Sequence, residues 1–230
     1  MKKILIALAA IAIGSQVAEA QLTNQVLSRN AVGYIKTTLQ TNKLYLLRND
    51  FVGLQAPLAI SNAIGNQLPI NSQVLLYNEA NQTYKAAIIY TAFGWGTGGT
   101  NRLPRGEAFF VRMPAAAASN QYQLFLMGEV PDTITAPTTT FNTVTGLNMD
   151  GYPYPTEARW TNTQYSKSLA INAQILTWNV TNQNYNAAVI KTAFGWGASG
   201  NALIIPPGQG FFIRSTNAVS FGEAKPYTWP

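Results

Sequence analysis

Short apolar stretches that alternate with polar residues run through most of the chain, and clusters of Asn, Gly and Pro separate them. Alternation with a period of two, rich in β-branched and aromatic residues, is typical of β-strands with one buried face. The predicted strands are Val32–Leu39, Lys43–Leu47, Val74–Tyr77, Tyr84–Tyr90, Glu107–Met113, Tyr122–Glu129, Ile175–Trp178, Tyr185–Lys191, Gln209–Ser215 and Ala218–Glu223. We therefore expect an all-β fold, either a β-sandwich or a small barrel, with one short helix at residues 56–66.

The chain repeats itself. Residues 71–96 and 172–197 are identical at 16 of 26 aligned positions. Further matches follow after a one-residue insertion, where Gly106, Phe109, Phe110 and Arg112 align with Gly208, Phe211, Phe212 and Arg214. A repeat of this length predicts a tandem pair of homologous modules, residues 21–132 and 133–230, joined at residues 131–140. In both copies an Asn-rich segment, Asn78–Gln82 or Asn179–Gln183, predicts a hairpin loop.

The first 20 residues have the pattern of a secretory signal peptide. Lys2 and Lys3 precede the apolar run Ile4–Ile13, and Ala18-Glu19-Ala20 forms a small-x-small cleavage site. The apolar run is about half the roughly 20 residues that a bilayer-spanning helix needs, and no later run reaches that length. We therefore expect a secreted mature chain that begins near Gln21 and resides outside the cell or on its surface, with the periplasm as the alternative.

The chain contains no Cys and no His. These absences exclude Ser-His-Asp and Cys-His catalysis, disulfides, and the usual ligands of zinc, haem and iron–sulfur clusters. A glycosidase needs two converging carboxylates, and the sequence does not show whether any two converge. Glu129 and Glu223 align between the copies, which indicates a structural role such as binding the amides of a turn, and Gln209 replaces Glu107. We predict no catalytic, cofactor or metal site.

Charged residues make up only 10% of the chain, against about 25% in average proteins. Removal of Lys2, Lys3 and Glu19 with the signal peptide lowers the formal charge from +6 to +5. The remaining basic residues are scattered, whereas nucleic-acid binders concentrate them, so no nucleic-acid partner is expected. Low charge weakens the repulsion between copies and favours the docking of flat polar surfaces.

Several motifs resemble those of β modules in secreted and surface proteins of bacteria. Leu147–Pro155 followed by Trp160 is similar to their N-P-Y-P…W opening, and Pro207–Ile213 resembles their P-G-Q-G-F-F strand entry. Thr177-Trp178-Asn179 followed by Tyr185 is similar to their hairpin, and the first half keeps a weaker copy in Leu47–Asp50 and Pro104–Phe110. The resemblance implies an exported β-sandwich module without a catalytic site.

These observations favour a non-enzymatic structural protein of the cell surface that associates with copies of itself, as in a fibre, sheath or surface layer. Gln21–Leu39 has a polar start and then an apolar alternation through Val32, Tyr34 and Ile35. This segment predicts either an ordinary first strand or a strand that adds to the open sheet edge of a neighbouring copy or another surface protein.

The alternative is a pair of carbohydrate-binding modules with a polysaccharide partner. Trp95 and Trp196 lie in identical Ala-Phe-Gly-Trp-Gly segments, with Tyr77 and Trp178 at equivalent positions, and exposed rings could stack on sugars. The same motif also fits core packing, in which one aromatic of each segment fills the core and the adjacent glycine bends the backbone.

Overall fold

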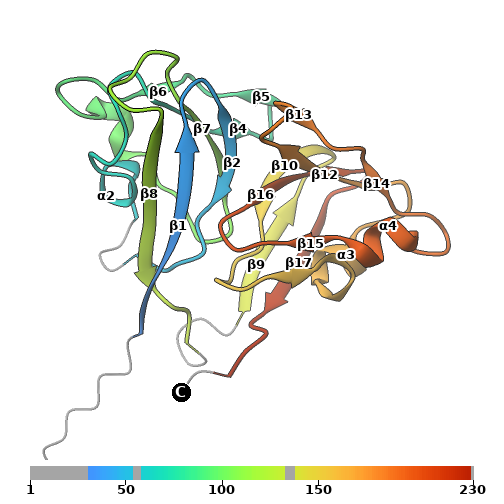
Figure 1. Cartoon of the computed structure of the whole chain (residues 1–230). Helices are drawn as coiled ribbons and strands as arrows, with labels where there is room; N and C mark the ends of the chain where they lie inside the picture. The colour runs from blue at the N-terminus through green and yellow to red at the C-terminus, as the bar shows by residue number, and fades with distance from the viewer. Residues whose placement is uncertain (1–30, 54–57, 133–137, 229–230) are drawn as a thin grey trace, which may run out of the picture. The chain divides into compact units, whose positions relative to one another are not determined.

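Antiparallel strands dominate the computed structural model, which describes residues 31–53, 58–132 and 138–228 (Figure 1). The predicted signal peptide and the segment Gln21–Asn30 lie outside the described residues. The expectation of an all-β fold is confirmed. Within the described residues no helix is long and apolar enough to cross a membrane.

The elements fall into two series. The first half contains β1 (Val32–Gln40), β2 (Leu44–Arg48), α2 (Ile60–Ala63), β3 (Gln73–Leu75), β4 (Tyr77–Asn78), β5 (Thr83–Tyr84), β6 (Ile88–Ile89), η1 (Gly96–Thr100), β7 (Ala108–Arg112) and β8 (Gln121–Glu129). The second half contains β9 (Thr138–Thr143), β10 (Gly146–Gly151), β11 (Ala158–Arg159), η2 (Trp160–Asn162), α3 (Gln164–Ser168), β12 (Gln174–Asn179), β13 (Asn184–Tyr185), β14 (Val189–Ile190), α4 (Gly197–Ala202), β15 (Ile204–Ile205), β16 (Gly210–Ser215) and β17 (Val219–Ala224).

Each half contains a larger sheet and a two-stranded ribbon, and the short pairs β4-β5 and β11-β15 complete the strands of the described residues. The first sheet has the order β2-β7-β3-β6, and its ribbon pairs β1 with β8. The second sheet has the order β10-β16-β12-β13, with β14 also on β12, and its ribbon pairs β9 with β17. One core fills each half, and a third core, which includes Leu46, Phe110, Met149 and Phe212, joins the two sheets.

The central strands β7 and β16 are buried on both faces, which explains their unbroken apolar sequence. Phe109 and Val111 of β7 point into the core of the first half, whereas Phe110 points into the core between the sheets. Phe211 and Phe212 of β16 divide in the same way.

Three features differ from the sequence prediction. The return strands predicted at Tyr84–Tyr90 and Tyr185–Lys191 are each interrupted, because an Ala pair with low β-propensity occupies the middle of each. The strands β9 and β10 and the helix α4 were not predicted, since Thr, Asn and Gly are frequent in these segments, and the five-residue helix α3 was not predicted either. Helix α2 is shorter than the predicted residues 56–66, of which 56 and 57 are not described.

The alignment of Glu129 with Glu223 does not describe a shared role. Leu124 and Leu126 point into the core from β8, whereas Phe221 and Glu223 point inward from β17. A shift of one residue places a strand's side chains on the opposite face. The Glu223 carboxylate accepts bonds from the amides of Gln164 at 2.7 Å and Tyr165 at 3.4 Å, as predicted for a turn-binding acid.

Candidate functional site

The two halves meet through residues at equivalent positions. Leu47 of β2 lies opposite Phe109, and Asp150 of β10 lies opposite Phe211, so Leu47 and Asp150 correspond. Isolated bridges then cross between the halves, from Leu47 to Gln209 and from Glu107 to Asp150. Two further main-chain bonds follow the same pattern: the Arg48 amide donates to the Gly208 carbonyl at 3.0 Å, and the Gly151 amide donates to the Gly106 carbonyl at 2.7 Å.

Two glutamines extend this reciprocal pattern. Gln82 accepts from the amide of Leu147 at 2.6 Å and donates to its carbonyl at 2.9 Å. Gln183 does the same for Leu44, at 2.8 and 3.3 Å. Both glutamines have positive φ, +55° and +53°, although the sequence suggested that Asn would adopt the turn conformation. Each half therefore closes a main-chain edge of the other.

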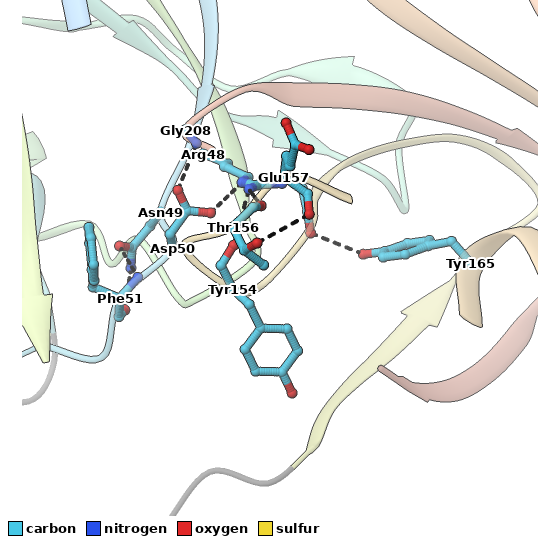
Figure 2. A network of polar contacts seen from close by, with 10 residues as sticks. Arg48, Asn49, Asp50, Phe51, Tyr154, Thr156, Glu157, Tyr165 and Gly208 are labelled. Carbon is cyan, nitrogen blue, oxygen red and sulfur yellow. Dashed lines mark hydrogen bonds and ion pairs between the residues drawn. The ribbon is translucent and has the colours of Figure 1, made fainter. Parts of the chain in front are cut away.

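A buried ion pair strengthens this junction (Figure 2). Arg48 pairs with Asp50 and also donates to the carbonyl of Tyr154 at 3.2 Å, while Asp50 accepts from the amide of Gly208 at 2.7 Å. Burial raises the pKa of Asp50 to about 6, against the opposing effects of Arg48 and that amide. The network links segments distant in sequence, so we interpret it as structural.

The two tryptophans of the repeated motif are buried. Trp95 is 6% exposed and donates to the carbonyl of Gly65 at 2.7 Å, and Trp196 is 7% exposed and donates to the carbonyl of Ser166 at 2.9 Å. A Cβ on Gly99 or Gly200 would collide with the Cβ of Trp95 or Trp196, so these glycines give the two tryptophan side chains room to enter the core. The tryptophan of each Ala-Phe-Gly-Trp-Gly segment is therefore a core residue.

Tyr77 and Trp178 are half-buried where the two sheets meet. The Tyr77 ring packs edge-on against Phe212 at 5.4 Å, and Trp178 packs edge-on against Phe110 at 5.3 Å. The indole of Trp178 also donates to the carbonyl of Leu44 at 2.8 Å. Tyr77, Trp95, Trp178 and Trp196 thus do not form the exposed aromatic platform that the carbohydrate alternative requires.

The phenylalanine of each Ala-Phe-Gly-Trp-Gly segment is exposed to solvent. Phe93 and Phe194 are each 99% exposed. The turn that carries Phe93 is closed by reciprocal main-chain bonds between Thr91 and Gly94 of 2.9 and 3.0 Å. The Thr91 hydroxyl accepts from the Phe93 amide at 3.1 Å, and the same frame recurs around Phe194. Sequence reasoning recognised that one aromatic of each pair would be buried but did not identify which one.

The predicted assembly strand lies in β1, and its alternation agrees with the period-two pattern. Val32 and Tyr34 are 61% and 67% exposed, whereas Ile35 points inward and contacts Gly208 closely enough that a Cβ there would clash. Met127, opposite Tyr34 on β8, is 49% exposed. An apolar strip therefore covers the outer face of the first ribbon.

A charged cavity opens at the junction. Its volume is about 440 Å³, and it is lined by Tyr77, Asn78, Glu79, Lys85, Pro104, Arg105, Glu107, Thr140, Phe141, Asn142, Met149 and Asp150. Burial raises the pKa of Glu107 to about 7 and raises those of Asp150 and Glu79 above their usual range. Among the described side chains, no group of His, Cys, Asp and Glu has the geometry to hold a metal ion.

Scans of protein-family models and searches of curated proteins and solved structures found no match for this chain. The resemblance to exported bacterial β modules therefore stays a prediction.

Proposed function

We propose that the chain is an exported, non-enzymatic structural protein that associates with copies of itself through the outer edge of β1. A fibre, sheath or surface layer built from such copies is the biological form that fits this role. The observation that carries the proposal is the uncovered main chain of β1 beside two exposed apolar side chains.

The direction of the β1 main chain follows from its register. The Val130 amide donates to the Ala31 carbonyl at 2.8 Å, so this pair is hydrogen-bonded, and bonded pairs alternate along an antiparallel ladder. The amides and carbonyls of Val32, Tyr34, Lys36 and Thr38 therefore point away from β8. Within the described part of the chain these groups have no hydrogen-bond partner.

Side chains or single bridges cover main-chain groups at several other strand edges. On β8 the Gln67 side chain bonds both main-chain groups of Phe125, at 2.7 and 3.2 Å, and Val52 pairs with Glu129. Gln82 and Gln183 cover Leu147 and Leu44 in the same way. Natural proteins usually block exposed edges because an open edge is a template for another strand. The open edge of β1 therefore supports strand addition.

The exposed side chains beside this edge support the same role. A second copy that adds a strand to β1 would place side chains against Val32 and Tyr34, and apolar cross-strand pairs stabilise a sheet by about 0.2–1 kcal/mol each. The uncharged turns at Phe93 and Phe194 offer additional contact points.

A proline at an outward-facing position of β1 tests the proposal. The Lys36→Pro variant lacks an amide proton that points away from β8, so the hydrogen bonds between β1 and β8 remain. A strand added to the outer edge of β1 would lose the hydrogen bond that this amide donates. Mature chains, residues 21–230, are compared by sedimentation velocity over a concentration series and by negative-stain microscopy. We expect the wild type to form regular assemblies and Lys36→Pro to stay monomeric.

Lys36→Ala is the matched control, because it also removes the cationic side chain near the Phe125 ring but keeps the amide. It should assemble like the wild type, and both variants should melt as single cooperative units. A wild type that stays monomeric at every concentration, or a Lys36→Pro variant that assembles normally, contradicts the proposal.

A further inference from the structure

The junction contains two cavities at equivalent places, and they differ in chemistry. The charged cavity of about 440 Å³ has a counterpart of about 260 Å³. The smaller cavity is lined by Thr37, Tyr45, Leu46, Leu47, Trp178, Val180, Pro207, Gly208 and Gln209. No side chain in that lining is charged.

The equivalence holds residue by residue. Sequence alignment pairs Tyr77 with Trp178, Glu79 with Val180, Arg105 with Pro207, and Glu107 with Gln209. Strand register adds the pairs Met149 with Leu46 and Asp150 with Leu47. Lys85 of the charged cavity aligns with Asn186. Five charged residues therefore stand where the equivalent positions are all neutral.

The fold does not need two of these carboxylates. Neither Glu107 nor Asp150 donates or accepts a side-chain hydrogen bond within the described residues, and Lys85 only offsets the charge of Glu107 from a distance. Desolvated carboxylates without partners are costly. The neutral cavity forms the same junction without them. Glu79 differs, because its carboxylate accepts from the Met149 amide at 3.1 Å.

We infer that the charged cavity is a binding site for an uncharged saccharide. Its volume lies within the range of about 300–1,000 Å³ that is common for ligand sites. The lining offers carboxylate acceptors, the donors Lys85 and Arg105, and the amides of Asn78 and Asn142. Sugar hydroxyls both donate and accept, so they complement this mixture. An anionic ligand would be repelled by the carboxylates of the lining, and a cationic ligand by Lys85 and Arg105.

This site is separate from the edge of β1. It also differs from the four-aromatic platform, because of those four residues only Tyr77 lines it. The binding surface here is hydrogen-bonding and concave.

A glycan array of immobilised neutral, amino and uronic-acid oligosaccharides, probed with the mature chain, tests the inference. We expect retention of neutral oligosaccharides and at least a tenfold loss in the double variant Glu107→Gln/Asp150→Leu. These substitutions install the residue types of the equivalent cavity, so the protein should stay folded. Gln209→Ala in the neutral cavity is the matched control and should bind like the wild type.

Retention by the Lys36→Pro variant should equal that of the wild type, which separates this site from self-association. No retention of any neutral oligosaccharide overturns the inference, as does retention only of charged ones. Equal retention by the wild type and the Glu107→Gln/Asp150→Leu variant overturns it as well.

Discussion

The outer faces of the two ribbons show how the halves of this protein differ. On the first ribbon the outward positions of β1 include Val32, Tyr34 and Lys36, whereas on the second ribbon β9 places Thr138, Thr140 and Asn142 outward. Each strand also carries an inward apolar side chain at the junction: Ile35 and Phe141 each contact a glycine of the opposite half. The halves therefore agree where the fold needs a residue and differ where it does not.

The two junction cavities show the same contrast between shared and differing positions. The main chain around the charged cavity and around the neutral cavity is equivalent, and the charged side chains lie at positions where the halves differ. Positions that agree between the halves should thus control stability, and positions that differ should control interactions.

The largest effect is expected at the shared tryptophans. Trp95→Ala or Trp196→Ala removes a buried indole and its hydrogen bond, so each should lower the free energy of unfolding by about 3–5 kcal/mol. Urea denaturation of the two variants measures this. A loss below about 1 kcal/mol in either variant would show that its indole is not part of the core.

The second effect is a pH dependence confined to desolvated carboxyls. Unfolded Glu107 loses its proton near the usual pKa of 4.5, while the folded protein holds it until about pH 7. The folded state therefore binds more protons in this window, and stability is full below about pH 4.5 and falls as pH rises through 7. We expect Glu107 to account for on the order of 1–2 kcal/mol after allowance for solvent in the open cavity.

Thermal unfolding of the wild type and Glu107→Gln across this pH range checks the prediction. The variant should lose stability less steeply, and the remaining slope should come from groups such as Glu223, whose pKa burial raises to about 7. Parallel curves for the two proteins would refute the assignment.

A smaller gain in stability is expected at neutral pH. Replacing Glu107 and Asp150 with Gln and Leu removes two half-buried carboxylates that have no side-chain partner among the described residues, so the double variant should be about 1 kcal/mol more stable at pH 7.5. Denaturant midpoints at this pH measure the change. Destabilisation would mean that the carboxylates support the fold, and the contrast between the two cavities would lose its functional meaning.

The smallest effect on stability belongs to the exposed phenylalanines. Phe93→Ser and Phe194→Ser should change the free energy of unfolding by less than about 0.5 kcal/mol, because neither ring is buried. The double variant should nevertheless weaken self-association in sedimentation experiments. Unchanged association would remove these turns from the interface and leave the β1 edge alone.

Sequence patterns predicted most of the strands, because period-two alternation marks β1 and runs of apolar, β-branched or aromatic residues mark β7, β8, β12 and β16. They missed β9, where three threonines after a proline resemble a linker, and β10, where Asn and Asp interrupt the apolar pattern. Tertiary pairing with β17 and β16 makes these segments strands.

The candidate sites were predictable only in part. The sequence grouped Val32, Tyr34 and Ile35 in one assembly strand, whereas the structure places Val32 and Tyr34 on the outer face and turns Ile35 inward. The choice between Phe93 and Trp95 depended on the turn at Gly94, whose φ is +89°. The charged cavity was not predictable, since Glu107 and Asp150 meet only through a bridge between the halves.

Amide hydrogen exchange of the mature chain, followed by NMR at low and high protein concentration, tests self-association through β1 most directly. The amides of Tyr34, Lys36 and Thr38 point away from β8, so they should exchange rapidly in dilute solution and become protected as assemblies form. The amides of Ile35 and Thr37, which point toward β8 and bond to it, should be protected from exchange at both concentrations. Assemblies that form while the outward amides stay unprotected would contradict the account.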